Sequence, residues 1–141
     1  MPTKTEPTEG RAVKNLWGTL PIEPSVLAPV AILRQQGDLL ARATDGLLIT
    51  DTRVVQLEFD KYAPGGFQVT MHLVATALNN YHFQILTVTH GIELYPAWVV
   101  AEQERMECED QDAFEEAVEK VLQSDRVHRA ISGLLAQMRS N

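Results

Sequence analysis

The feature that most constrains this fold is a pair of alternating segments, residues 67–78 and 81–90, separated by Asn79 and Asn80. They predict a β-hairpin, because asparagine tolerates the positive φ angles that both central positions of a tight two-residue turn require. A sheet with one wet face alternates apolar with polar residues, whereas this hairpin is apolar on both faces. We therefore expect each face to be covered by another element, a second copy or a partner.

A two-residue turn fixes the register of the hairpin, with Ala77 opposite His82. One face is then apolar in its middle and suits the domain's own helices, whereas the other is apolar near the turn. A three-residue loop would instead shift the register by one residue and move one strand's side chains to the opposite faces. In the first register, the patch that we predict to contact a partner or a second copy consists of Val74, Leu78, Tyr81, Phe83 and Ile85.

The composition fits one acidic globular domain. The chain has 141 residues, of which 45% are hydrophobic, and a net charge of −7. Nucleic acids and anionic membranes bind basic surfaces, so we expect neither as a partner. Cys108 is the only cysteine, which excludes an intrachain disulfide and favours a cytoplasmic location. No apolar run reaches the roughly 18 residues of a membrane-spanning helix, and residues 1–9 lack the apolar core of a signal peptide.

The order of the elements predicts an α+β fold with an antiparallel meander. Residues 1–12 form a flexible tail and residues 13–141 a single domain, in which the proline-interrupted apolar segment 16–24 is an extended arm laid across another surface. The expected elements are a helix from Pro29 to near Gly46, a strand over 52–60, the two hairpin strands, a fourth strand over 94–106, and two C-terminal helices with caps at Asp112 and at Ser124 or Asp125.

The first helix carries two unexpected residues in its apolar stripe, Gln36 and Gly37. Glycine costs about 1 kcal/mol against alanine in a helix interior, so Gly37 predicts a close approach of helix to sheet. Gln36 needs hydrogen-bond partners if it is buried. Together with Tyr95 and Trp98 it forms a second candidate site, a small-molecule pocket between this helix and the sheet. Ordinary core packing of the same residues is the alternative.

The sequence contains no pattern of catalytic or metal-binding residues. His82 and His90 share a face of the predicted hairpin but lie about 27 Å apart at the rise of a strand, too far for one metal. The acidic run 102–119 lacks the sixth-position glycine of an EF-hand loop, and no serine lies in a G-x-S-x-G motif. Acidic neighbours make Cys108 a poor nucleophile. We expect no catalytic residue, no metal and no cofactor.

The two-sided hairpin therefore favours a non-catalytic protein-interaction module: an adaptor, chaperone or inhibitor of another protein that forms a homodimer through a sheet face. The alternative is a small-molecule-binding or enzymatic domain that uses the pocket between the first helix and the sheet.

Overall fold

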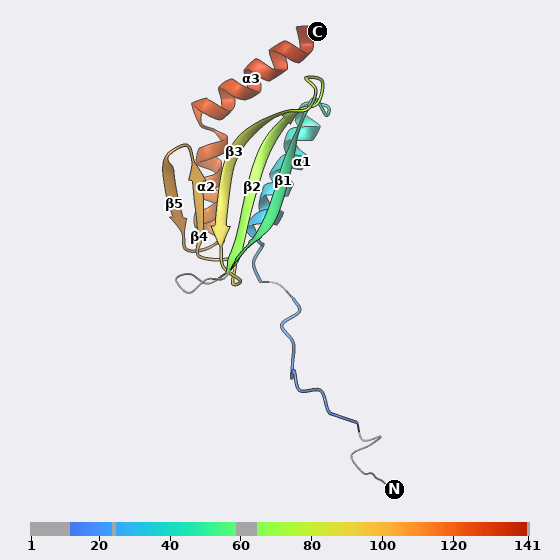
Figure 1. Cartoon of the computed structure of the whole chain (residues 1–141), viewed down its shortest axis with the longest axis vertical. Coiled ribbons are helices and arrows are strands. Elements are labelled where there is room, and N and C mark those ends of the chain that lie inside the picture. Colours follow the sequence, from blue (N-terminus) through green and yellow to red (C-terminus); the bar gives the residue numbers. More distant parts are fainter. Residues whose placement is uncertain (1–11, 24, 59–64, 141) are drawn as a thin grey trace.

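The computed structural model of the chain describes residues 12–23, 25–58 and 65–140. The described residues form three helices and five strands (Figure 1). The elements are α1 (Pro29–Ala43), β1 (Leu48–Leu57), β2 (Gly66–Ala75), β3 (Tyr81–His90), β4 (Ala97–Ala101), β5 (Glu104–Cys108), α2 (Gln111–Leu122) and α3 (Asp125–Ser140). The predicted α+β class and the order of helix, sheet and two helices are confirmed.

The sheet is an antiparallel meander in which each strand pairs with the next one along the chain. It has five strands rather than the predicted four, because the chain turns at Glu102, whose φ is 56°, and β5 returns along β4. The first strand begins at Leu48, earlier than predicted. Residues 1–11 of the predicted tail, Pro24 of the arm, and residues 59–60 of the predicted first strand lie outside the described residues.

The hairpin turn lies at the predicted asparagines, but the strands pair in a different register. Asn79 and Asn80 have φ angles of 57° and 55°, and the Tyr81 N–H donates a hydrogen bond to the Leu78 carbonyl. A second turn precedes this one, because the Leu78 N–H also donates to the carbonyl of Ala75. Five residues therefore connect β2 to β3.

This longer connection makes the predicted pairing of Ala77 with His82 wrong, since Val74 lies opposite His82. The register shifts again between Met71 and His72, where β3 carries Ile85 as an extra residue in a β-bulge. Both differences change which side chains share a face.

All three helices lie on one face of the sheet, which we call the inner face; the opposite face is called the outer face (Figure 1). The α1 helix packs along β1, α2 packs on β4 and β5, and α3 contacts β2 and α2. The buried core lies between the helices and the inner face, and its largest fully buried side chains are Phe114, Leu33, Leu48, Met71, Leu73 and Leu86. None of the helices within the described residues is long and apolar enough to cross a membrane.

The ends of α1 and its approach to the sheet follow from particular residues. Pro29 starts the helix, and Gly46, at a φ of 79°, follows its last turn as the sequence predicts. Gly37 lies so close to β1 that a Cβ atom there would meet the side chain of Thr50. The predicted close approach of helix to sheet is confirmed.

The caps of the C-terminal helices are partly as predicted. Asp110, rather than Asp112, caps α2, because its side chain accepts a hydrogen bond of 2.9 Å from the Ala113 N–H. Ser124 Oγ accepts a longer hydrogen bond, 3.4 Å, from the Val127 N–H at the start of α3.

The predicted arm is extended but covers neither face of its own hairpin. It leaves the domain beyond the N-terminal end of α1 (Figure 1). Leu16, Trp17 and Ile22 are 75%, 78% and 77% exposed.

Candidate functional site

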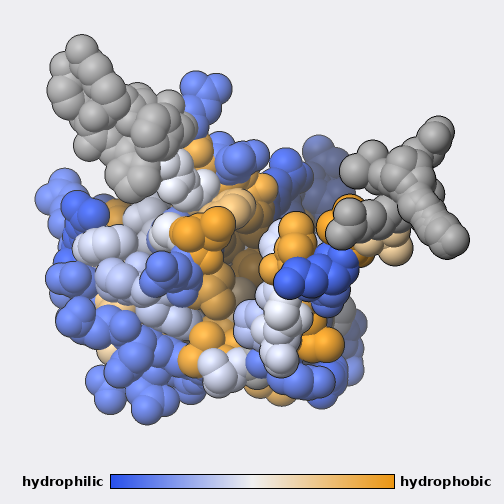
Figure 2. Space-filling view, turned by 90° about the horizontal axis from the view of Figure 1, so that it is seen from below, coloured by the Kyte–Doolittle hydropathy of each residue, from blue (hydrophilic) through white to orange (hydrophobic). Residues whose placement is uncertain are grey.

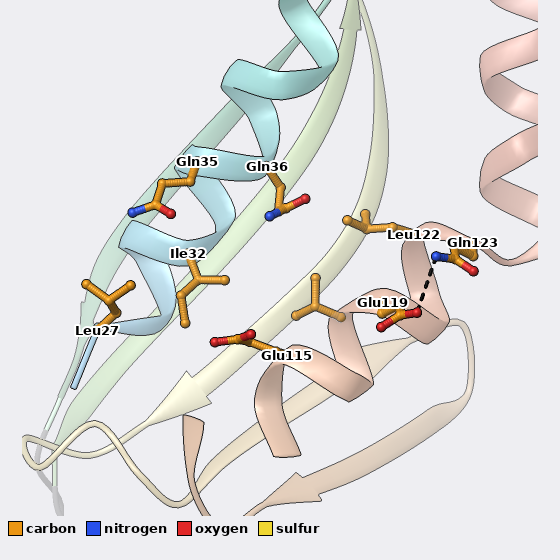
Figure 3. A pocket seen from close by; sticks show the side chains of 9 residues that line it. Leu27, Ile32, Gln35, Gln36, Glu115, Glu119, Leu122 and Gln123 are labelled. Atoms are coloured by element: carbon orange, nitrogen blue, oxygen red, sulfur yellow. Dashed lines mark hydrogen bonds between the residues drawn. The ribbon is translucent and has the colours of Figure 1, made fainter. Parts of the chain in front are cut away.

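A groove runs across the inner face between α1 and the C-terminal helices. Because α1 packs along β1 and α2 packs along β4 and β5, the helices cover the inner face of the middle strands only in part. Two adjoining cavities of about 420 and 270 Å³ share Gln36 and Leu122 and together form this inter-helix groove. Figure 3 shows Gln36 of α1 and Leu122 of α2 pointing toward each other across it.

The lower half of the groove, which is the cavity of about 420 Å³, has an apolar floor and a polar rim. Its lining residues are Leu27, Ile32, Gln35, Gln36, Glu115, Val118, Glu119, Leu122 and Gln123. At this end of the molecule, apolar side chains gather at the centre with polar side chains on either side (Figure 2). The half-buried Gln36 amide has no hydrogen-bond partner among the described residues.

The upper half is almost wholly apolar. Its lining residues are Gln36, Leu39, Leu40, Thr50, Met71, Leu73, Ile85, Leu122, Val127 and Ile131. Leu39 is 54% exposed although it borders this apolar space. The groove as a whole can hold an extended apolar chain segment, and none of the residues that line it is basic.

Tyr95 closes the lower end of the groove without lining it. Its hydroxyl donates a hydrogen bond of 2.8 Å to the Leu27 carbonyl, and its ring packs edge-on against Phe114 with centroids 6.1 Å apart. Burial, and then the negative charge of Glu115, raises the pKa of Tyr95 from 10.0 to about 12. Gln111 Oε1 accepts the Leu27 N–H at 2.9 Å, so both polar backbone groups of Leu27 are held.

The structure brings together only two of the three predicted pocket residues. Gln36 lies in the inter-helix groove, whereas Trp98 lies on the outer face, where the Arg105 guanidinium is 5.4 Å from its ring centroid. Tyr95 and Trp98 share a different, more open cavity of about 470 Å³ beside Ile92, at the lower end of β3 and β4. The inter-helix groove was missed because it depends on the spacing of two helices over the sheet, for which the sequence has no local signal.

The five residues of the predicted interface patch do not share one open face. Val74 lies on the outer face at 4% exposure, and Tyr81 is 55% exposed beside the turn. Leu78 is half-buried in the turn and packs against the core.

The other two residues of that patch lie on the inner face. Phe83 pairs with Leu73, and Cζ of Arg126 on α3 lies 4.5 Å from the centroid of the Phe83 ring. Ile85 is the extra residue of the bulge and is 3% exposed within the core. The five-residue connection and the bulge therefore divide the expected patch between the two faces.

None of the described helices covers the outer face of the sheet. Two rows of residues cross all five strands on this face. One row is Arg53, Thr70, Thr87, Val100 and Arg105, and the next is Val55, Gln68, Thr89, Trp98 and Glu107. The middle of the face is uncharged and rich in threonine, and its charges lie at the two sheet edges.

The upper corner of the outer face holds a small polar cluster. His82 Nε2 is 3.7 Å from Asp51 Oδ2, which also accepts a hydrogen bond of 2.9 Å from Arg53. The His72 ring packs edge-on against His82 at 5.7 Å between centroids. Within residues 12–23, 25–58 and 65–140, no group of three or more His, Cys, Asp and Glu side chains could hold a metal ion.

Cys108 is buried under the sheet at 1% exposure. Burial first, and then the charges of Asp110 and Glu107, raise the pKa of its thiol. Because the thiolate is the reactive form, this cysteine is unsuited to act as a nucleophile.

Comparison with known proteins finds no family model, no curated protein and no solved structure that matches this chain.

Proposed function

We propose that this chain is a non-catalytic protein-interaction module, an adaptor, chaperone or inhibitor of another protein, and that it forms a homodimer through the outer face of its sheet. The observation that carries the proposal is the outer face itself, which crosses five strands and has no described helix over it. Monomeric soluble proteins rarely leave a sheet face of this extent with exposed valine and isoleucine side chains, here Val55 and Ile49.

The size of the face is sufficient for a specific contact. Three strands of ten residues and two of five span roughly 630 Å² at a rise of about 3.3 Å and a spacing of about 4.8 Å. Two such faces bury about 1,300 Å² in total, which lies within the range of stable protein–protein interfaces.

The charges of the face also permit self-association. One sheet edge carries Asp51 and Arg53, and the other carries Arg105 and Glu107. A twofold axis parallel to the strands would lay each edge of one copy over the opposite edge of the other, so that a neutral pair meets a neutral pair. In this arrangement Arg53 and Arg105, which share a row, would face each other with Asp51 and Glu107 close by, and the threonines and Val100 would fill the centre.

The test is a charge placed at the centre of the face. We expect Thr87→Arg to lower the mass of the assembly in light scattering, because the new charge would be buried in the sheet-face contact without a partner. Ser132→Arg, which adds the same charge at an exposed position of α3, should leave the mass unchanged. A strict monomer at high concentration for the unmodified chain, or an assembly whose mass Thr87→Arg does not change, would contradict the proposal.

One observation favours the second candidate function, a small-molecule-binding domain. The lower half of the inter-helix groove, about 420 Å³, falls within the roughly 300–1,000 Å³ of typical ligand pockets. A specific ligand would raise the melting temperature by mass action, and Gln36→Leu should abolish that rise. If no compound in a broad metabolite panel shifts the melting temperature, this candidate has no support.

A further inference from the structure

The apolar arm, residues 16–22, is a hydrophobic segment that does not pack against the described part of its own domain. Its leucine, tryptophan and isoleucine side chains are exposed to solvent. The hydrogen bonds of its described residues are local, from the Trp17 N–H to Asn15 Oδ1 and from the Ile22 N–H to the Leu20 carbonyl. A segment of this composition is expected to be buried against an apolar surface.

The inter-helix groove is an apolar surface of matching length. It extends along α1 from Leu27 to Leu39, a distance of about 18 Å at the rise of a helix. Seven extended residues span about 23 Å at most, so the arm can cover the groove from one end to the other.

The connection between arm and groove favours a second copy over the same chain. The hydrogen bonds from Tyr95 and to Gln111 hold Leu27 at the mouth of the groove, and the arm leaves the molecule from there (Figure 1). To fill its own groove the chain would have to reverse direction within residues 21–26, a stretch that contains Pro21 and Pro24. Proline and the residue before it favour extended backbone, which carries the arm outward.

We infer that the apolar arm of one copy occupies the inter-helix groove of a second copy, and that two copies exchange their arms reciprocally about a twofold axis. In this arrangement the two groove mouths face each other, and residue 16 lies near the deep end of the groove beside Leu39. The exchange is independent of the outer sheet face, because it uses the opposite side of the molecule.

The fluorescence of Trp17 tests the exchange in the full chain. The chain has two tryptophans, so Trp98→Phe leaves Trp17 as the single reporter. We expect its emission to shift to the blue as protein concentration rises and to return to the red on dilution. Emission typical of exposed indole at every concentration would overturn the inference, and so would a blue emission that does not depend on concentration, since the arm would then lie in its own groove.

Two matched variants in the same background locate the contact. Leu39→Glu places a charge at the deep end of the groove and should abolish the concentration-dependent shift. Ile92→Glu makes the same change at a residue that is 84% exposed and outside the groove, and it should leave the shift unchanged. Equal effects of the two variants would refute the groove as the binding site.

Mixed cysteine variants provide a readout that does not depend on Trp98→Phe. A chain carrying Leu16→Cys, mixed with one carrying Leu39→Cys, should form a disulfide-linked pair on oxidation, whereas the buried Cys108 should not react. A doubly substituted chain that closes only within itself would contradict the exchange. Thr87→Arg should leave all of these results unchanged, so a failure of the sheet-face dimer and a failure of the arm exchange are distinguishable.

Discussion

Replacing Gly37 by alanine should destabilise the protein, although alanine is the better helix former. The new methyl group would meet Thr50 Oγ1 and would lie 3.1 Å from Thr50 Cβ. Threonine is branched at Cβ and stiff in a strand, and rotation about its Cα–Cβ bond leaves Thr50 Cβ itself 3.1 Å from the new methyl group. The helix must therefore move from the sheet.

The magnitude follows from two opposing effects. Overpacking of this kind costs about 1–3 kcal/mol, whereas the higher helix propensity of alanine stabilises by about 1 kcal/mol. Gly133 on α3 isolates the second effect, because nothing lies within 4 Å of a Cβ atom built there. We expect Gly133→Ala to stabilise by about 0.5–1 kcal/mol and Gly37→Ala to lie about 2 kcal/mol below it.

Urea unfolding measures this difference. With an m-value of about 2 kcal/mol/M, 2 kcal/mol separates the midpoints of the two variants by about 1 M urea. Thr50→Ala should recover much of the loss in the Gly37→Ala background, with a coupling energy of about 1–2 kcal/mol. If both glycine variants gain the same stability, α1 does not depend on Gly37 for its distance from the sheet.

Three further perturbations test other contacts. Asp110→Ala should lower the free energy of unfolding in urea by about 1 kcal/mol, because it removes the cap of α2. Asp112→Ala changes a nearby acidic residue that is not the cap and should lower it by about 0.3 kcal/mol. Equal losses would contradict the assignment of the cap. Arg126→Ala removes two hydrogen bonds to carbonyls of β3 and should cost about 2 kcal/mol, and Arg126→Lys should recover less than half because lysine lacks the guanidinium fork. Because the pKa of Tyr95 is about 12 in the folded chain and 10.0 in the reference state, deprotonation favours the unfolded chain, and stability should fall as pH rises from 10 to 12. Tyr95→Phe should flatten this fall, and an unchanged pH dependence in that variant would refute the assignment.

The elements that follow from short stretches of sequence were predictable. Pro29 at the start of α1, Gly46 after its end and the small residue Gly37 against the sheet each act through backbone geometry that a neighbouring residue cannot override. The turn at Asn79 and Asn80 is of the same kind, since both residues adopt the expected positive φ.

The register of the hairpin was not predictable from the same stretch. The turn that begins at Ala75 extends the connection, and the bulge at Ile85 returns an apolar side chain to the core. The bulge places Ile85 in the same cavity wall as Val127 and Ile131 of α3, which lies about 40 residues further along the chain. A local sequence pattern carries no information about packing against so distant a helix. The predicted patch from Val74 to Ile85 depended on the register and was therefore wrong in its arrangement.

The split of the predicted fourth strand has a simpler cause. The turn at Glu102 uses a positive φ at a residue that carries no turn signal, in a segment without glycine, asparagine or proline. The charged residues around it belong to a hairpin between β4 and β5.

The order of the strands in space, which is also their order in the chain, has a consequence for how the protein folds. Each hairpin closes a short loop, so the entropy lost on forming the sheet is spread over successive small steps rather than concentrated in one distant pairing. The helices follow the same order, since α1 precedes its partner β1 and α2 follows its partner β5. The contact order is therefore low for a protein with a five-stranded sheet, and refolding in the millisecond range is expected.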